Sequence, residues 1–418
     1  METILGIDRD NRDFCGERPP RAGAFALVVL IPRPLPANLF QRESPIKAPT
    51  MNPLLLLATA TVSLGLSTSV PGAEVKRVRV AEGGKGFVLA PGGTPFVPWG
   101  FNYDHDEKSR LIEDYWAAEW PKVEQDFAEM KDLGANVARI HLQVGKFLRG
   151  PDDPNPEALD RLGKLLTLAE KTGLYLDLTG LGCYRKRDVP PWYDALDEPG
   201  RWRAQAAFWT AVAGRCKGSP AVFCYDLMNE PVVPGGARKP GDWLGPPFGE
   251  FHYVQVVTLD QKGRPRPEVA LSWLQRLASA VRKADPDHLV TVGLVDWSLD
   301  RPGLSSGFVP EKIAGPLDFL AVHVYPDAGP KGLDAALGTL RGFAAAGKPV
   351  VVEETFPLRC GPADMTRFFD RSRSERLADG WIGFYWGKTA ADCRKSGALA
   401  DALTAGWLDL FRQGPPHP

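Results

Sequence analysis

The sequence has no excess of charge of either sign, because 50 Lys and Arg residues stand against 51 Asp and Glu residues, for a net charge of −1. A protein that binds nucleic acid through a basic surface needs an excess of positive charge, so this class is excluded. Cysteine and histidine are scarce, with six of each in 418 residues. No Cys-x-x-Cys or His-x-x-x-His spacing points to zinc, so we expect no metal and no cofactor.

Long hydrophobic runs are also missing. The apolar run at residues 54–66 is thirteen residues long, whereas a membrane span needs about 20. It follows Met51 and precedes the small and polar stretch 67–73, which is the segment order of a secretory signal peptide. A buried core helix is the alternative, but nothing upstream could cover it. The order therefore predicts a signal peptide over 51–73, translation from Met51, and a secreted or periplasmic protein whose mature chain begins near Glu74.

Residues 1–50 do not resemble the rest of the chain. They carry Arg-Pro clusters at 18–21 and 32–34 and show no amphipathic period longer than a turn. We expect this segment to be unstructured or to lie upstream of the true start.

The composition of the whole chain is that of a soluble globular protein with a generous aromatic supply. Hydrophobic residues make up 44%, and there are 12 Trp, 9 Tyr and 20 Phe. This excludes a disordered protein. Aromatic faces suit ring-shaped or partly apolar ligands.

From residue 75 onward, short apolar segments alternate with amphipathic ones, which indicates a parallel sheet with helical crossovers. We expect eight strands, at 95–102, 136–142, 174–179, 222–228, 289–295, 317–324, 350–354 and 381–386. We expect eight helices, at 121–133, 156–171, 202–216, 267–284, near Glu311, and at 333–346, 363–377 and 398–411. This set predicts an α/β fold, a (β/α)8 TIM barrel.

Two additions to the barrel are expected. A β-hairpin at 77–80 and 86–89 would close one end, and the long Pro- and Gly-rich segment 232–266, with a hairpin at 252–259, would form an insertion after the fourth strand. Residues 74–418, 345 in all, fit a single barrel domain. An open doubly wound sheet is the alternative fold, but no Gly-x-Gly-x-x-Gly turn follows the first strand.

Polar and aromatic residues finish nearly every predicted strand. In a (β/α)8 barrel the chemistry lies at the carboxyl ends of the strands, so this concentration indicates a site at that rim. The residues are Asn102, Tyr103, Asp104, His105, Arg139, His141, Gln143, Asn229, Glu230, His323, Tyr325, Glu353, Glu354 and Trp386.

Two of these carboxylates suit glycoside cleavage, which needs one acid for the leaving oxygen and one nucleophile at the anomeric carbon. Glu230 ends the fourth strand and Glu354 the seventh, and these strands face each other across an eight-stranded barrel. A separation of about 5 to 5.5 Å would indicate retention of configuration, and about 6.5 to 9.5 Å inversion.

The sequence resembles the clan A glycoside hydrolases, and most of all family 5, the cellulase and mannanase family. The resemblance runs from about Thr94 to Trp386. The motifs that carry it match in order, each on its expected strand: Gly100-Phe101-Asn102, Asn136-Val137-Ala138-Arg139, Asn229-Glu230-Pro231, His323-Val324-Tyr325, Glu354 and Trp386.

This resemblance implies a role for each matching residue. Glu230 would be the acid/base and Glu354 the nucleophile. Arg139 would keep the nucleophile's carboxylate ionised and Tyr325 would donate to it, while His323 would help to set the protonation of Glu230. Two further contacts are implied with the sugar, a hydrogen bond to its 2-hydroxyl from Asn229 and a floor beneath it from Trp386.

The sequence also departs from the family pattern. Thr179 ends the third strand where the family usually has His, so a sugar contact or proton relay would be missing or supplied by His141 or His105. The nucleophile is followed by Thr355-Phe356-Pro357, where an aromatic-Gly pair is common. We therefore expect a divergent member whose substrate the pattern does not fix.

Some residues admit a plainer interpretation. Neighbours on a strand point to opposite faces, so only one of Glu353 and Glu354 could face the barrel mouth. We favour Glu354, with Glu353 buried against a helix or paired with a cation. Rim aromatics could stack on sugars or simply pack: Trp297, Trp192, Trp243 and Phe308. The run Arg185-Lys186-Arg187-Asp188 could be a solvated face or contact an acidic sugar.

Three functions remain open at this point. The first is a secreted retaining glycosidase, acting as a monomer on a β-linked glycan without nucleic-acid or membrane partners. The second is a barrel that binds carbohydrate without cleaving it. The third is a metal-dependent hydrolase, for which only the scattered His105, His141 and His323 are on offer as rim ligands.

Overall fold

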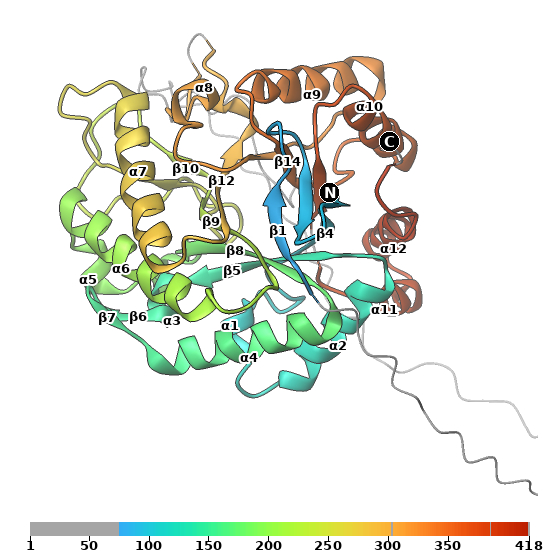
Figure 1. The fold of residues 1–418 in the computed structure, drawn as a ribbon, viewed down its shortest axis with the longest axis horizontal. Coiled ribbons are helices and arrows are strands. Elements are labelled where there is room, and N and C mark those ends of the chain that lie inside the picture. Colours follow the sequence, from blue (N-terminus) through green and yellow to red (C-terminus); the bar gives the residue numbers. More distant parts are fainter. Residues whose placement is uncertain (1–74, 302–303, 385, 417–418) are drawn as a thin grey trace, which may run out of the picture. The chain divides into compact units, whose positions relative to one another are not determined.

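The computed structural model describes residues 75–301, 304–384 and 386–416. The unstructured segment and the signal peptide predicted over 1–50 and 51–73 lie outside these residues. Within them, eight parallel strands close into a barrel in the order β12-β13-β14-β15-β4-β5-β8-β9, and helices surround it (Figure 1). The strands are β4 (Trp99–Tyr103), β5 (Val137–Gln143), β8 (Tyr175–Gly182), β9 (Val222–Asn229), β12 (Leu289–Val295), β13 (Leu320–His323), β14 (Val350–Thr355) and β15 (Gly380–Gly383). The predicted (β/α)8 barrel is confirmed.

The helices between these strands lie close to the predicted ranges. They are α2 (Trp120–Asp132), α4 (Pro156–Thr172), α6 (Glu198–Cys216), α7 (Arg266–Ala284), α8 (Pro310–Ile313), α9 (Gly329–Ala344), α10 (Pro362–Ser374) and α12 (Leu399–Phe411). Four short helices were not predicted: α1 (Ile112–Tyr115), α3 (Val144–Phe147), α5 (Pro191–Asp194) and α11 (Ala390–Ser396).

Helix α4 illustrates how local sequence sets these limits. The Asn155 side chain accepts from the Glu157 N–H and Pro156 occupies the first turn, where no N–H is needed. At the other end Gly173 adopts a left-handed conformation with φ of 68°, which stops the helix.

The amino-terminal end of the barrel is closed by the predicted hairpin, β1 (Arg77–Val80) and β2 (Phe87–Ala90), which pair antiparallel. A third strand, β3 (Thr94–Phe96), pairs with β2, so the strand expected over 95–102 is divided. The reason is Pro98, which has no N–H for a continuous ladder. Phe87 of the hairpin packs edge-on against Phe223 and Phe319 of the barrel floor.

The insertion after β9 differs from the prediction. Its short strands β10 (Pro231–Val232) and β11 (Gln255–Val256) pair in parallel, so the hairpin expected over 252–259 is wrong. The antiparallel partner of β11 lies further upstream, at Leu244, because the chain turns around Gly249 (φ 59°). Backbone hydrogen bonds tie this insertion to the loop after β8, with His252 N donating to Tyr184 O at 2.6 Å.

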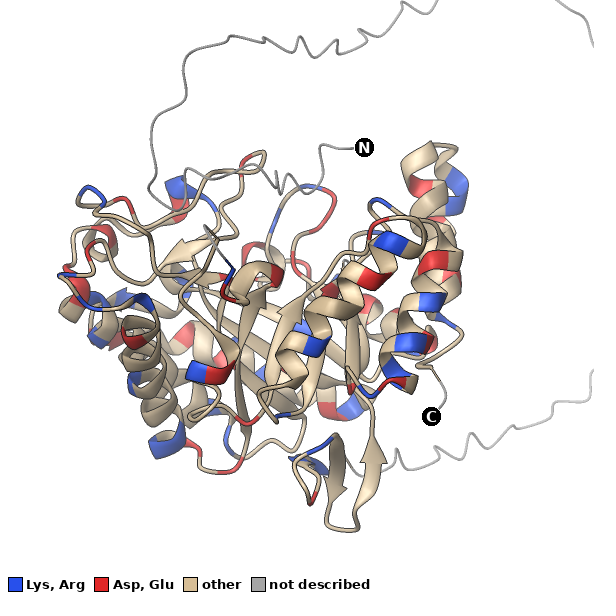
Figure 2. Cartoon of the chain, turned by 90° about the horizontal axis from the view of Figure 1, so that it is seen from above, with Lys and Arg blue, Asp and Glu red and all other residues tan. Residues whose placement is uncertain are grey.

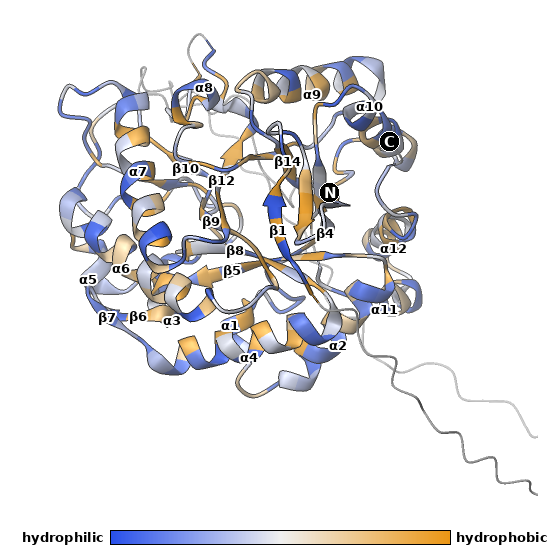
Figure 3. Ribbon diagram, in the orientation of Figure 1, coloured by the Kyte–Doolittle hydropathy of each residue, from blue (hydrophilic) through white to orange (hydrophobic). Residues whose placement is uncertain are grey.

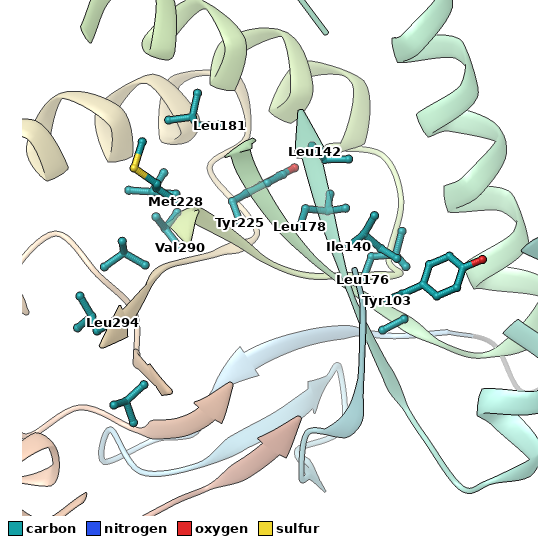
Figure 4. Close-up of a cluster of buried hydrophobic side chains, with 14 of the residues drawn as sticks. Tyr103, Ile140, Leu142, Leu176, Leu178, Leu181, Tyr225, Met228, Val290 and Leu294 are labelled. Atoms are coloured by element: carbon teal, nitrogen blue, oxygen red, sulfur yellow. The ribbon is translucent and has the colours of Figure 1, made fainter. Parts of the chain in front are cut away.

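Strand alternation divides the side chains into two sets. One set is apolar and packs against the helices, including Ile140, Leu142, Leu176, Leu178, Val290 and Leu294 (Figure 4). Accordingly, the barrel strands are mostly hydrophobic and the surrounding helices have both hydrophobic and hydrophilic faces (Figure 3). The other set of side chains points into the barrel. Next to the β1–β2 hairpin these side chains are apolar and form a layer with those of the hairpin.

Charged residues are spread over the outer helices and connecting loops (Figure 2). No helix in the described part of the chain is both long and apolar enough to cross a membrane. Of the cysteines there, Cys183, Cys216, Cys224, Cys360 and Cys393 are all free thiols.

Candidate active site

Glu230 lies at the carboxyl end of β9 in an uncommon backbone conformation, with φ of 47°. A left-handed conformation costs a non-glycine residue about 1–2 kcal/mol. Two backbone hydrogen bonds hold it there: Glu230 N donates to Gly293 O at 2.9 Å, and Gln255 N donates to Glu230 O at 3.3 Å. The second bond comes from the insertion, which therefore helps to fix the backbone of this carboxylate.

Glu354 on β14 has both carboxylate oxygens bonded. Arg139 Nη1 donates to Oε1 at 2.6 Å and the Tyr325 hydroxyl donates to Oε2 at 2.7 Å. Burial and the nearby Glu354 raise the pKa of Tyr325 well above its usual range, so the phenol stays a donor. Glu354 is thereby fixed in orientation opposite Glu230.

His323, at the end of β13, lies between the two glutamates. Its Nδ1 is 2.9 Å from Glu230 Oε1 and 3.4 Å from Glu354 Oε2. Ligand atoms of these three residues all lie within 4.8 Å of one another. Burial alone would lower the pKa of His323, but Glu354 and Glu230 outweigh it and, with Glu353, raise it to about 10. His323 is therefore a cation at neutral pH.

Arg139 on β5 lies below this trio and is completely buried. Besides Glu354 it donates to Asn102 Oδ1 at 2.9 Å, to Asp226 Oδ2 at 2.8 Å and to Asn229 Oδ1 at 3.0 Å. Desolvation opposes its charge, but the carboxylates around it, led by Glu353 and Asp226, raise its pKa well above the usual range. The side-chain oxygens of Asn102 and Asn229 thus accept hydrogen bonds from Arg139 and do not lie unbonded in the barrel mouth.

The expectation that Glu353 and Glu354 point to opposite faces is wrong, whereas the expectation that Glu353 pairs with a cation agrees with its contact with Arg139. Val352 pairs with Trp381 and Thr355 pairs with Gly383, so β14 contains one residue more than β15 between these two pairs. Such a β-bulge breaks the alternation of side chains. Both glutamates face the interior, and Glu353 Oε2 lies 3.4 Å from Arg139 Nη2 and 3.4 Å from His323 Nε2.

Glu353 belongs to a second group of buried carboxyls, together with Asp177 on β8 and Asp226 on β9. These two aspartates were not predicted as site residues. The sequence contained a signal for Asp177. This residue lies two positions before Thr179, so it points into the barrel as Thr179 does, and it pairs in register with Arg139. Burial and Glu353 raise the pKa of Asp177 well above its usual range and that of Asp226 to about 6.

Two clusters bring acidic and histidine groups close enough to be considered as cation ligands: Glu230 with His323 and Glu354, and Asp177 with Asp226 and Glu353. In the first, Glu354 and Glu230 raise the pKa of His323, whose Nδ1 lies 2.9 Å from Glu230 Oε1 and 3.4 Å from Glu354 Oε2. In the second, the Arg139 guanidinium already fills the place of a counter-ion at 2.8 Å from Asp226. Both clusters are arranged as ion pairs.

At the strand-end position where a His was expected, the Thr179 hydroxyl donates to Asp226 Oδ2 at 2.8 Å. Two histidines lie nearby in the fold. His141 on β5 places Nδ1 2.6 Å from the Tyr184 hydroxyl, and its buried Nε2 has no hydrogen-bond partner. Burial lowers the pKa of His141 to about 3, so it is neutral. His105 is 2.7 Å from the buried Asp104 instead.

The predicted aromatic contacts divide into two groups. Trp386 is 2% exposed and packs against Phe101, with ring centroids 5.5 Å apart, and its backbone N–H donates to Asn102 O at the barrel rim. Trp297, in the turn after β12, is partly exposed. By contrast, Trp243 is completely buried under the Arg201 guanidinium, so it packs inside the insertion and offers no face to a sugar.

Two other predicted features have structural roles. Phe308 is buried edge-on against Trp273, and Trp192 contacts Tyr193. The basic run after β8 is in part a solvated face, since the side chains of Lys186 and Arg187 are 52% and 66% exposed. Three of its residues pair with acids: Arg185 with Asp114, Lys186 with Asp194, and Arg187 with Glu250.

Comparison with known proteins identifies relatives. The model of the family described as Cellulase (glycosyl hydrolase family 5) matches residues 93–355, which include both glutamates. A probable mannan endo-1,4-beta-mannosidase C of Aspergillus terreus is 26% identical over 286 residues, 63% of this chain and 61% of that protein. A probable mannan endo-1,4-beta-mannosidase A of Aspergillus flavus is 23% identical over 352 residues, 73% of this chain and 81% of that protein. This chain thus spans less than two thirds of the first relative.

Solved structures share the fold. An exo-beta-1,4-mannosidase from Opitutaceae bacterium strain TAV5 superposes with a TM-score of 0.55 at 18% identity, over 71% of this chain and 53% of that one. An endo-1,4-beta-mannanase from Rhizomucor miehei gives a TM-score of 0.53 at 18% identity, over 81% and 100%. At this identity the likeness concerns the barrel alone.

Proposed function

The chain belongs to glycosyl hydrolase family 5, and from that premise we propose that it is a retaining glycoside hydrolase in which Glu354 is the nucleophile and Glu230 the acid/base. The single observation that supports this most is the pair itself. The glutamates come from β9 and β14, which are separated in the barrel by β12 and β13, and an oxygen of one lies within 4.8 Å of an oxygen of the other. This upper limit lies on the side of the roughly 5–5.5 Å between the carboxyl groups of retaining enzymes, and not of the roughly 6.5–9.5 Å of inverting ones.

In the first step, a Glu354 oxygen attacks the anomeric carbon and the glycosidic C–O bond breaks. The leaving oxygen takes the proton of Glu230, and a covalent glycosyl ester forms on Glu354. Arg139 and Tyr325 hold the nucleophile in position, as their bonds of 2.6 and 2.7 Å indicate. In the second step, Glu230 takes a proton from water, the water oxygen attacks the anomeric carbon, and Glu354 is released.

For the substrate we propose a β-1,4-linked mannan or manno-oligosaccharide. The support is that the curated relatives reported above carry mannan endo-1,4-beta-mannosidase names. Trp386 would form the floor under the sugar. His141 would supply the contact that Thr179 cannot, because its Nε2 is buried, neutral and without a partner, and a sugar hydroxyl would satisfy it.

The test is a panel of polysaccharides and aryl β-glycosides, including mannan, glucomannan, cellulose and xylan, assayed for released reducing ends. We expect turnover of mannan, with the anomeric configuration of the first product retained by NMR. Glu354→Ala should abolish turnover, and azide should restore bond cleavage and yield a glycosyl azide of inverted configuration. Glu230→Ala should slow substrates with poor leaving groups most.

The matched control is Glu124→Ala, which removes an exposed carboxylate from α2, a helix outside the barrel, and should keep wild-type rates. Circular dichroism of all variants excludes misfolding. An inverted product, or a Glu354→Ala variant as active as the wild type, would overturn the mechanism. Turnover of cellulose or xylan in preference to mannan would overturn the substrate only.

We also propose that the protein is exported, on the strength of the signal-peptide order over residues 51–73. Mass spectrometry of the native protein should then find an N-terminus near Glu74. A peptide from residues 8–21 in the exported protein would reject this proposal.

A further inference from the structure

Glu353 is a buried carboxylate that the two-glutamate mechanism leaves without a role. It has no exposed surface, yet it lies 3.4 Å from His323 Nε2, and the opposite ring nitrogen of His323 lies 2.9 Å from Glu230 Oε1. The imidazole is therefore held between two carboxylates, one at the site and one beneath it. Deleting either would change the charge that the other experiences.

The backbone is built to admit this contact. The β-bulge in β14 turns Glu353 inward beside Glu354. On β12, Gly293 leaves the space where three charged groups meet, because a Cβ there would lie 2.9 Å from Glu353 Oε2, 3.0 Å from Arg139 Nη2 and 3.1 Å from His323 Nε2. Two independent strands thus make room for one junction.

The groups that face Glu353 come from four strands: Arg139 on β5, Asp177 on β8, Asp226 on β9 and His323 on β13. Burial alone would raise the pKa of Glu353, but Arg139 and His323 outweigh it and lower the pKa below the usual range. Both oxygens of Asp177 lack a hydrogen-bond donor. A neutral Asp177 satisfies itself by donating its proton to Glu353, which agrees with the direction of its pKa.

We propose that Glu353 is a positioning residue that keeps His323 in its protonated form against Glu230, and so fixes the pH range over which Glu230 exchanges its proton with substrate and water. The inference rests on the proposed function of Glu230. Glu353 acts through His323 and touches no substrate. Asp177 takes part only as a neutral donor.

Replacing Glu353 by Gln removes the anion while keeping the shape. His323 then loses its proton at a lower pH, because one of its carboxylate partners is gone. Once His323 has lost its proton, no cation lies 2.9 Å from Glu230, and an opposite charge that close favours the ionised form of a carboxyl group. The alkaline limb of the kcat/KM profile should move to higher pH by about one unit or more, the size of effect of an opposite charge at this distance.

The experiment compares wild type, Glu353→Gln, Glu353→Asp and Asp177→Asn by pH profiles of kcat/KM. Glu353→Asp keeps the charge and should restore part of the wild-type limb. Asp177→Asn is the matched control, because it copies the neutral form of a neighbour that contacts Glu353 but not His323, and its limbs should stay in place. An equal shift in Asp177→Asn, or a fall in kcat without a shift in Glu353→Gln, overturns the proposal.

Two further measurements separate this proposal from the proposed function. In ¹⁵N-histidine NMR, which needs no substrate, His323 should titrate at a lower pH in Glu353→Gln than in the wild type, with its signal identified by loss in His323→Asn. An unchanged titration overturns the inference even if the glycosidase activity is established. In the His323→Asn background, adding Glu353→Gln should leave the alkaline limb where it is, and an additive shift would show that Glu353 acts by another route.

Discussion

A methyl group added at Gly293 tests whether the charged junction inside the barrel controls the active site. Gly293 N donates to Asp226 Oδ1 at 2.7 Å, and its carbonyl accepts from Glu230 N at 2.9 Å. Its missing side chain leaves the gap where the polar ends of Glu353, Arg139 and His323 meet. Gly293→Ala therefore adds one carbon atom at the point where these three side chains meet.

The size of the effect follows from the distances. The new Cβ would lie 2.9 to 3.1 Å from three charged atoms, where ordinary contact begins at 3.4 Å, so the groups must move by a few tenths of an ångström. Overpacking of this kind costs about 1–3 kcal/mol of unfolding free energy. A misplacement of 1 Å can cost about a hundredfold in rate, so a shift of half that size should lower kcat/KM about tenfold.

The assays are kcat/KM on the best substrate of the panel and urea unfolding. Gly338→Ala is the matched control, because Gly338 lies inside α9 and a Cβ there meets nothing within 4 Å. It should stabilise the protein by up to about 1 kcal/mol and leave the rate unchanged. A Gly293→Ala variant with wild-type rate and stability would refute the reasoning, as would equal losses in both variants.

Three further outcomes are expected. Tyr325→Phe removes a donor to the Glu354 carboxylate at 2.7 Å, so kcat/KM should fall about 10- to 100-fold and the unfolding free energy by about 1.5–3 kcal/mol; a loss of rate below threefold would contradict this. Arg139→Met leaves buried carboxylates without their cation and should lower the unfolding free energy by about 3–5 kcal/mol in urea; wild-type stability would contradict it. The pKa of His323 is raised to about 10, so its protonation adds fully to the unfolding free energy below the unfolded value near 6.5, and this contribution is lost as the pH rises toward 10. The pKa of His141 is lowered to about 3, so the unfolding free energy falls as the pH drops from 6.5 toward 3. Urea unfolding across pH should show His141→Gln flattening the acid side only, and a steeper acid side would refute the assignment.

The barrel was predictable because its evidence is local and repeated. Helices such as α4 carry their own caps, and strands such as β12 stand out as apolar segments of the right length. The divided first strand and the insertion were not, because they depend on a proline in a ladder and on pairing between segments more than twenty residues apart. Propensity gives no account of such long-range pairing.

The site was predictable where a residue follows a strand, as Glu230 and His323 do. The prediction failed at Glu353, because it assumed strict alternation of side chains along the strand. A bulge arises from the pairing of two strands, and the sequence of one strand does not reveal it. Asp177 and Asp226 were missed for a different reason. Buried charge is rare and costly, so an aspartate inside an apolar strand attracts attention only once a partner such as Arg139 is known to face it.

The single arginine shared by carboxylates of several strands makes the two halves of the barrel dependent on each other. Arg139 and Asp226 come from β5 and β9, whereas Glu353 and Glu354 come from β14. A fragment that ends after β9 contains the cation without two of its anions, and the remaining fragment has those anions without the cation. A chimera that takes one half of the barrel from a relative should therefore fold stably only if that half carries the complementary buried charges.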